Sequence, residues 1–170
     1  MRAGESSARL RAMSYRIASF PLVFTLLLGA CGGFDVQPVT PSPGVDSALA
    51  TATVARVEVA TAPEMAEDKL RMMERFDVLG VIQQRVGQSF EAAGKFDAAT
   101  PGLSVRITVD EFRNGRYGPA FMGASVVVVD AAGQVVEEFH VREETRRMSN
   151  RTNRLGIVTQ GIVTQVVHGV

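Results

Sequence analysis

The pattern of apolar and polar positions changes soon after residue 53. Residues Val54–Ala60 alternate between apolar and charged side chains, which is typical of a strand with one buried face. From there to about Ala93, apolar residues recur every three or four positions and predict one long amphipathic helix. Thr61 and Glu64 have the spacing of a capping box, with Pro63 in the first turn, and place the start of this helix. Its apolar stripe consists of Met65, Met72, Phe76, Leu79, Ile82, Val86 and Phe90.

Three more strands are predicted after the helix, which Gly94 is well placed to end. Residues Val105–Asp110 alternate like the first strand, whereas Ala124–Val129 is nearly all apolar and is therefore expected at the centre of the sheet. Asp130–Gly133 has the composition of a tight turn and leads into a strand from Val135 to about Glu143. In that strand the inward residues should be Val135, Phe139 and Val141, and the outward residues Glu138, His140 and Arg142.

The end of the chain contains a repeated pentapeptide, Gly156–Gln160 followed by Gly161–Gln165. Its β-branched residues favour a strand, but one helical face gathers Leu155, Val158, Ile162 and Val166. We therefore expect a closing helix, and the order of elements is β-α-β-β-β-α. This order predicts an α+β fold in which a mixed four-stranded sheet carries two helices on one face.

The first 31 residues have the organisation of an export signal. Arginines precede an apolar run, Phe20–Ala30, which is too short for a membrane-spanning helix, and Cys31 follows it directly. Met13 would give a more compact signal and is an alternative start of translation. The four residues Leu28, Gly29, Ala30 and Cys31 resemble the bacterial lipobox.

The lipobox resemblance implies a membrane anchor. Leu28, Gly29 and Ala30 would be recognised by a signal peptidase, and Cys31 would be lipidated and become the first residue of the mature protein. Several acyl chains hold a protein stably on a bilayer. The lipid bilayer is therefore an expected partner of this chain, through acylated Cys31. Gly32 follows the cysteine where an aspartate would favour the inner membrane, so we expect the periplasmic leaflet of the outer membrane.

Composition separates the mature chain into a tether and a single domain. Residues 31–52 are rich in proline and glycine and should form a flexible tether, while residues 53–170 are long enough for one domain. Cys31 is the only cysteine, so the domain can form no internal disulfide. Without residues 1–30, which hold four arginines and one glutamate, the formal charge falls from zero to −3. This mildly acidic balance gives no footprint for nucleic acid.

No motif in the chain indicates catalysis. Ser125 lacks the glycine that would follow a nucleophile at a strained turn, and the two histidines, His140 and His168, are expected on the surface. Adjacent carboxylates on a strand point to opposite faces, so we expect none of the pairs to share a proton. These pairs are Asp110–Glu111, Glu137–Glu138 and Glu143–Glu144. The sequence therefore predicts no enzyme, no cofactor and no metal.

Two segments are candidates for binding. The loop over residues 112–121 places arginines among aromatic residues, a composition typical of interface hot spots, although a plain connector would read the same way. Its candidate residues are Phe112, Arg113, Arg116, Tyr117 and Phe121. The second candidate is a basic cluster formed by Arg142, Arg146, Arg147, Arg151 and Arg154, for which a solvated loop is the alternative.

Two stretches and the lipobox resemble an uncharacterised family of bacterial lipoproteins of unknown function. The stretches are Phe112–Gly115 and Gly123–Asp130. The resemblance implies a small α/β envelope lipoprotein that acts as a non-enzymatic interaction or assembly module. Its partner would be another envelope protein or a second copy of the chain. The alternative is a periplasmic ligand-binding or hydrolytic protein whose site lies around the 112–121 loop.

Overall fold

The computed structural model describes residues 37–38, 52–114, 118–145 and 151–170. The order of elements is β-α-α-β-β-β-α, so the predicted α+β class is confirmed, with three helices in place of two. The strands are β1 (Val54–Thr61), β2 (Leu103–Arg113), β3 (Phe121–Val129) and β4 (Val135–Glu144). The helices are α2 (Glu67–Arg75), α3 (Val78–Ala92) and α4 (Arg151–Gly169).

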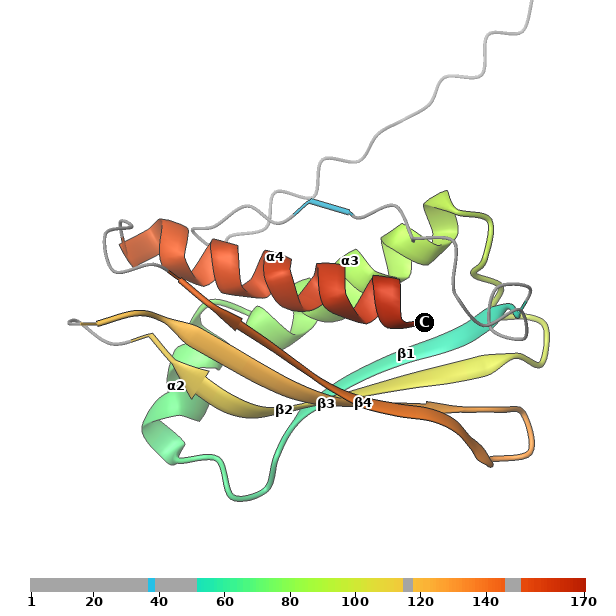
Figure 1. The fold of residues 1–170 in the computed structure, drawn as a ribbon, viewed down its shortest axis with the longest axis horizontal. Helices are drawn as coiled ribbons and strands as arrows, with labels where there is room; N and C mark the ends of the chain where they lie inside the picture. Colours follow the sequence, from blue (N-terminus) through green and yellow to red (C-terminus); the bar gives the residue numbers. More distant parts are fainter. Residues whose placement is uncertain (1–36, 39–51, 115–117, 146–150) are drawn as a thin grey trace, which may run out of the picture.

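The four strands form one mixed sheet in the spatial order β1-β2-β3-β4 (Figure 1). β1 pairs with β2 in parallel, and the two later pairings are antiparallel. The nearly continuous apolar strand, β3, therefore lies between β2 and β4, as predicted. β4 lies at an edge of the sheet, which agrees with the exposed or half-buried state of most of its residues.

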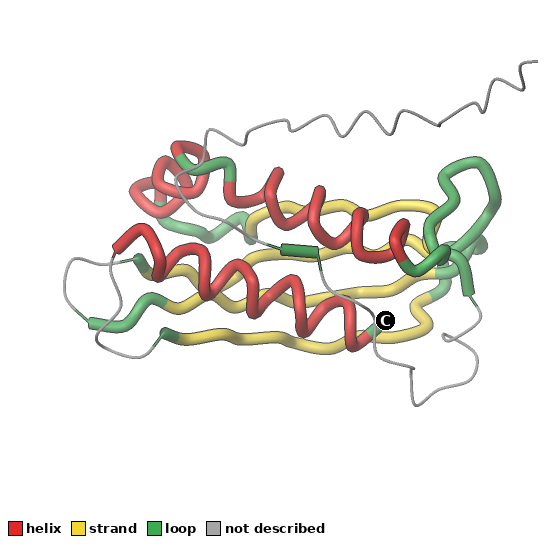
Figure 2. The backbone as a smooth tube through the Cα atoms, turned by 90° about the horizontal axis from the view of Figure 1, so that it is seen from above, coloured by secondary structure: helices red, strands yellow, loops and turns green. Residues whose placement is uncertain are grey.

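Helices α3 and α4 lie side by side across one face of the sheet (Figure 2). The core fills the space between this helix layer and the sheet. Its fully buried members come from every strand and from all three helices, and they include Met73, Phe90, Ile107, Phe112, Met122, Leu155 and Ile162. The opposite face of the sheet carries no helix among the described residues.

The prediction of one long first helix is wrong, because the chain breaks between α2 and α3. Asp77 adopts a left-handed conformation, with φ of 48°, and its N–H donates to the carbonyl of Glu74 at 3.0 Å. Aspartate tolerates this conformation better than most residues. The capping box is also wrong, since Thr61 ends β1 and the helix starts six residues later at Glu67. Because of this break, α2 and α3 point in different directions at the end of the sheet, and both bury apolar residues in the same core.

The remaining element predictions are confirmed with one exception. Gly94 has a φ of 68° and follows the end of α3, and α4 buries the four residues expected on its apolar face. Val141 in β4 faces the core, and Phe139 packs against it. Val135 is instead 59% exposed, because the register between β3 and β4 shifts at Val128 and Val129 and pairs Val135 with Val129 rather than with a core position of β3.

Helix α4 packs on the edge strand through two glycines. A Cβ atom on Gly161 would overlap the side chain of Glu143, and one on Gly169 would overlap the ring of Phe139. The spacing agrees, since eight residues of helix and four residues of strand each span roughly 12–13 Å. The helix and the strand run in opposite directions along this contact.

Gln165 lies between the two glycines and satisfies the backbone of the edge strand. Its Oε1 accepts from the N–H of Arg142 at 3.3 Å, and its Nε2 donates to the carbonyl of the same residue at 3.1 Å. The Nε2 also donates to Oε2 of Glu143 at 3.1 Å. One side-chain amide therefore takes the place that a fifth strand would occupy at this position.

We expect Gly169→Ala to lower the free energy of unfolding by about 1 kcal/mol. The new methyl group would overlap the ring of Phe139, which packs against the core. Displacing this ring costs roughly 1–3 kcal/mol and exceeds the 0.5–1 kcal/mol that alanine gains over glycine within a helix. Urea unfolding of the two proteins measures the difference. The matched control is Gly87→Ala in α3, where no atom lies within 4 Å of the added Cβ. This variant should be as stable as wild type or more so, and destabilisation of both variants to the same extent would contradict the packing argument.

Candidate functional site

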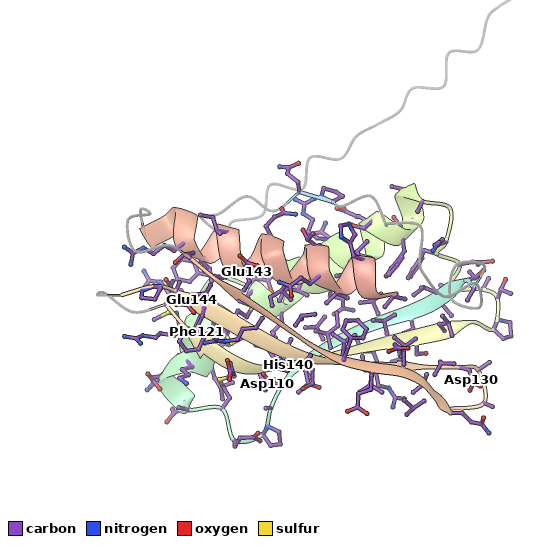
Figure 3. The ribbon with its side chains drawn as sticks, in the orientation of Figure 1. Asp110, Phe121, Asp130, His140, Glu143 and Glu144 are labelled. Atoms are coloured by element: carbon purple, nitrogen blue, oxygen red, sulfur yellow. The ribbon has the colours of Figure 1, made fainter. Side chains whose placement is uncertain are left out.

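The exposed polar groups of the sheet gather on the face opposite the helix layer, which we call the open face. Figure 3 shows Asp110 and His140 next to one another on this side, away from α4. The open face is built from the outward positions of all four strands. Its polar residues include Arg56, Glu58, Arg106, Asp110, Glu111, Ser125, Glu138, His140, Arg142 and Glu144.

A bulge in β2 places Asp110 and Glu111 on the same face, so the prediction that they point to opposite faces is wrong. The pairing with β3 shifts between Val109 and Glu111, which adds one residue to β2. The sequence carries a signal for this shift. Apolar core positions follow each other by two up to Val109, and the next one is Phe112, three residues on.

Asp110 lies at the centre of the open face and binds two side chains. Ser125 Oγ donates to its Oδ2 at 2.7 Å, and His140 Nε2 lies 3.1 Å from its Oδ1. Ser125 and His140 face each other across β3 and β4 in the strand register, which brings them to the same level. Gly123 leaves room for this group, because a Cβ there would come within 3.2 Å of both Asp110 Oδ1 and the His140 ring.

The environment lowers the pKa of Asp110 from its ordinary value of 3.8. Partial burial of the carboxyl raises the pKa, but the hydrogen bond from Ser125 and the hydrogen bond and charge of His140 together outweigh it. The carboxylate is therefore ionised at neutral pH and is held by its neighbours in that form.

The arrangement does not activate Ser125 as a nucleophile. In a catalytic triad the imidazole lies between the carboxylate and the hydroxyl and takes the proton of the hydroxyl. Here the carboxylate lies between the hydroxyl and the imidazole, so His140 does not receive that proton. A carboxylate whose pKa is lowered is a weak base. What this group of residues can do is hold charge and hydrogen-bonding capacity in fixed positions on an exposed surface.

Arg142 forms a second group on the open face. Its Nε donates to Glu111 Oε2 at 2.9 Å, its Nη2 lies 3.8 Å from Glu144 Oε2, and its guanidinium lies over the ring of Phe121 at 5.0 Å. The side chain is half exposed. This is an arginine placed flat on an aromatic ring and flanked by carboxylates, with part of its surface open to a partner.

Glu58 organises a third group at the other side of the sheet. Its carboxylate lies 2.7 Å from Arg56 and 3.4 Å from Arg106. All three side chains are more than one third exposed. The open face therefore presents both signs of charge in three separate groups along the sheet.

The structure corrects the predicted binding loop. Phe112 is only 1% exposed and belongs to the core, so it cannot contact a partner. Arg113 ends β2, and Phe121 begins β3 on the open face beneath Arg142. Arg116 and Tyr117 lie outside the described residues. Among the described residues of this set, Arg113 and Phe121 face each other in the register of β2 and β3 and lie on the open face, and Phe121 also contacts Arg142.

The predicted arginine cluster does not form one surface. Arg142 lies on the open face, whereas Arg154 in α4 donates from Nη1 to the carbonyl of Gly118 at 2.8 Å. The side chains of Arg146, Arg147 and Arg151 lie outside the part of the chain that the structure describes. The arginines that can be placed therefore serve different parts of the molecule.

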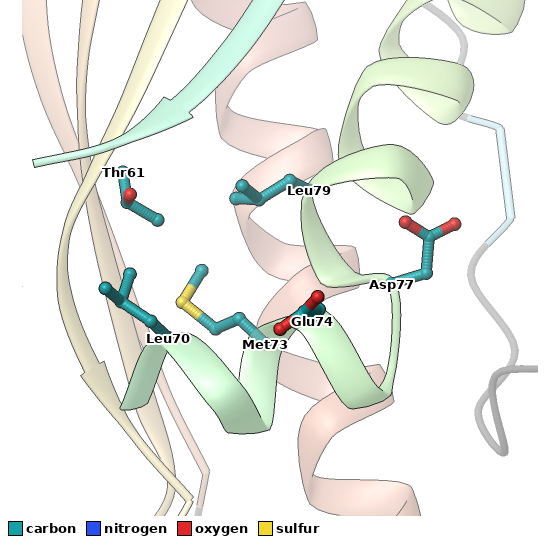
Figure 4. A pocket seen from close by; sticks show the side chains of 6 residues that line it. All are labelled: Thr61, Leu70, Met73, Glu74, Asp77 and Leu79. Carbon is teal, nitrogen blue, oxygen red and sulfur yellow. The ribbon is translucent and has the colours of Figure 1, made fainter. Parts of the chain in front are cut away.

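Two cavities formed by described residues lie away from both predicted segments. One of about 320 Å³ opens at the junction of α2 and α3 (Figure 4). Its lining residues are Thr61, Leu70, Met73, Glu74, Asp77 and Leu79. Another of about 320 Å³ lies along α3, beside Gln84 and Phe96. A cavity next to Phe112 and Arg113 measures about 140 Å³, well below the 300–1,000 Å³ typical of ligand pockets.

Over the described ranges, no group of three or more His, Cys, Asp or Glu side chains is close enough to hold a metal ion. No helix in those ranges is both long and apolar enough to cross a bilayer. The predicted lipidation site, Cys31, and the signal residues Leu28, Gly29 and Ala30 lie outside the described residues.

No protein-family model matches the chain, and no curated protein sequence matches it. Among solved structures, two of PelC from Paraburkholderia phytofirmans, both described as dodecamers, have TM-scores of 0.46 and 0.42. They are 13% and 12% identical, and the matches cover 78% and 79% of this chain and 96% of each PelC chain. The hypothetical protein CT253 from Chlamydia trachomatis has a TM-score of 0.44 at 12% identity, over 66% of this chain and 94% of that one. Identities and scores this low do not bear on function.

The lowered pKa of Asp110 predicts a specific pH dependence of stability. Because the folded pKa lies below the unfolded value, the ionised carboxylate stabilises the fold above about pH 3.8, and this contribution is lost as the pH falls through the folded pKa. Asp110→Asn does not titrate. Wild type should exceed it by about 0.5–1 kcal/mol at pH 7, the range for exposed pairs, and the difference should shrink towards pH 2–3.

Urea unfolding at several pH values measures this difference. Ser125→Ala is the control, since it removes one of the hydrogen bonds that lower the pKa but keeps the carboxyl group. Its pH dependence should lie between those of wild type and Asp110→Asn. A constant difference between wild type and Asp110→Asn from pH 7 to pH 3 would show that Asp110 is not held in its charged form.

Proposed function

We propose that the chain is a lipid-anchored lipoprotein of the bacterial envelope whose domain binds a protein partner through the open face. The single observation that carries the binding role is the open face itself. It is a sheet surface that no helix covers among the described residues, and charged and polar side chains are held on it in fixed geometry. A broad surface of this kind suits protein partners better than small ligands.

The composition of the open face supports a protein partner. Arginine and aromatic residues are enriched at interface hot spots, and Arg142 over Phe121 supplies both in one place. Carboxylates beside Arg142 and Glu58 between two arginines would give charge complementarity, which sets specificity and the rate of association. The small cavity next to Phe112 gives less support to the alternative of a ligand site at the 112–121 loop.

The anchoring role rests on the sequence. The lipobox-like residues Leu28–Cys31 follow a short apolar run with arginines before it, and a proline- and glycine-rich tether follows them. The acylated Cys31 would hold the domain at the periplasmic leaflet of the outer membrane. A membrane-bound module needs no catalytic centre, and the geometry around Ser125 supplies none.

Photo-crosslinking in cells tests the binding surface. A photoreactive amino acid replaces Arg106 on the open face or, as the matched control, Gln84 on the outer surface of α3; both positions are exposed. The open-face position should give one defined crosslinked product with an envelope protein, and the control position should give much less. Crosslinking of the same product at equal yield from both positions, or no product from either, would contradict the proposed surface.

Membrane fractionation tests the anchor in the same experiment. The wild-type protein should sediment with the outer membrane, and Cys31→Ala should be released into the soluble periplasmic fraction. Recovery of both proteins in the same fraction would show that Cys31 does not anchor the chain. That result would contradict the anchor only, and the crosslinking result would still decide whether the open face binds a partner.

Self-association is a second candidate, supported by the edge strand β4. Val135 and Val136 are 59% and 49% exposed there, and the strand is open on its outer side except where Gln165 binds Arg142. A second copy pairing along β4 would yield a crosslinked product of twice the chain mass from a probe at Glu138. Light scattering of the purified protein with Val136→Lys, compared with wild type, separates this candidate from a different partner.

A further inference from the structure

The two tether residues that the structure describes, 37 and 38, lie on the outer surface of the helix layer. Residues 37–38 lie over α3 and α4, on the side away from the sheet, in both perpendicular views (Figures 1 and 2). The N–H of Gln37 donates to Gln160 Oε1 at 2.6 Å, and Gln160 Nε2 donates to the carbonyl of Gln37 at 3.0 Å. We call these two hydrogen bonds the Gln160–Gln37 pair.

The two copies of the repeated pentapeptide make the same pair of hydrogen bonds to backbone elsewhere in the chain. Gln160 and Gln165 end the two copies, and each uses its side-chain amide to satisfy both the N–H and the carbonyl of one extended residue. Five residues of an α-helix turn through roughly 140° beyond a full circle, so the two amides point in different directions. Gln165 reaches the edge of the sheet, and Gln160 reaches the tether above the helices.

The position of this contact along the chain shortens the connection to Cys31. The full tether of residues 31–52 would place the domain about 25 Å from the bilayer, with free rotation. Gln37 lies only six positions after Cys31, and six residue steps span at most roughly 20 Å when fully extended. If the domain is held at Gln37, the segment that connects its helix layer to Cys31 is much shorter than the full tether of residues 31–52.

We infer that the Gln160–Gln37 pair turns the helix layer towards the lipid surface and the open face away from it. This inference rests on the proposed lipid anchor at Cys31. The charge distribution agrees with it. The outer surface of the helix layer carries mostly uncharged polar residues, including Gln83, Gln84, Gln88, Gln160 and Thr164, with Glu91 as a charged exception, whereas arginines and carboxylates concentrate on the open face. The surface that can approach lipid is the one with fewer charges to desolvate.

The contact itself is tested by backbone amide exchange of the full mature chain. The Gln37 amide should exchange about tenfold more slowly than those of the neighbouring tether residues, and Gln160→Ala should remove this protection. Gln165→Ala is the matched control, because it removes the equivalent amide from the other copy of the repeat. It should leave Gln37 protected and expose the amide of Arg142. Unprotected Gln37 in the wild-type chain would overturn the inference.

The orientation is tested with the lipidated protein in vesicles that carry a quencher on their headgroups. Cys31 is the only cysteine, so a cysteine introduced at Gln84 or at Glu138 is the only free thiol of the lipidated chain and takes one fluorophore. The label at Gln84 should be quenched several-fold more than the label at Glu138. Gln160→Ala should reduce this ratio towards one, while Gln165→Ala should keep it. Equal quenching at the two positions in otherwise wild-type protein would overturn the orientation.

Flotation of the vesicles separates this inference from the proposed anchor. Protein that floats with the vesicles and shows equal quenching contradicts the orientation but keeps the anchor. Wild-type protein that fails to float contradicts the anchor, and with it the orientation. Urea unfolding of Gln160→Ala should match wild type, which excludes a general loss of structure as the cause of any change.

Discussion

The contact between α4 and the edge strand β4 is the constraint on which the other features depend. At position 169 it requires glycine, because the ring of Phe139 occupies the space that a Cβ would fill, and at position 161 a Cβ would have to displace the flexible side chain of Glu143. The residue halfway between them on the helix, Gln165, is then brought to the backbone of Arg142. Because α4 is fixed in this way, the direction of Gln160 is fixed as well, and with it the place where Gln37 binds. A single helix thus closes the core, satisfies part of the sheet edge and positions the tether.

A large part of the fold could be predicted from periodicity alone. β3 is apolar at nearly every position because it lies between two strands, and α4 shows its four apolar positions at helical spacing in spite of its β-branched residues. The break at Asp77 could not be predicted in the same way. The apolar residues of α2 and α3 keep helical spacing across it, and only the backbone conformation of one residue separates the two helices. Exposure of Val135 was also missed, because it depends on a register shift between β3 and β4 that neither strand shows on its own.

The candidate site was harder to predict than the fold, for a reason that lies in β2. Alternation along a strand assigns each residue to a face only as long as the register is unbroken. The bulge after Val109 moves Glu111 to the face of Asp110, and it places carboxylates opposite both Ser125–His140 and Arg142. The three-residue step between the core positions Val109 and Phe112 records this bulge in the sequence. Pairing between strands cannot be read from either strand alone, so the group around Asp110 becomes visible only once β2, β3 and β4 are placed side by side.

The two outer surfaces of the domain have different chemistry, and this difference connects the proposed partner with the proposed orientation. On the open face, ion pairs and hydrogen bonds hold arginines and carboxylates in place, so a partner meets charges whose positions are already set. On the helix layer, side-chain amides prevail, and one of them binds the tether through only two exposed hydrogen bonds. Each such bond adds about 0.5–1.5 kcal/mol, so the tether contact is reversible and biases the orientation without locking it. A partner that binds the open face would therefore meet a domain already turned towards it. The remaining freedom of the tether would let the domain adjust its distance from the membrane.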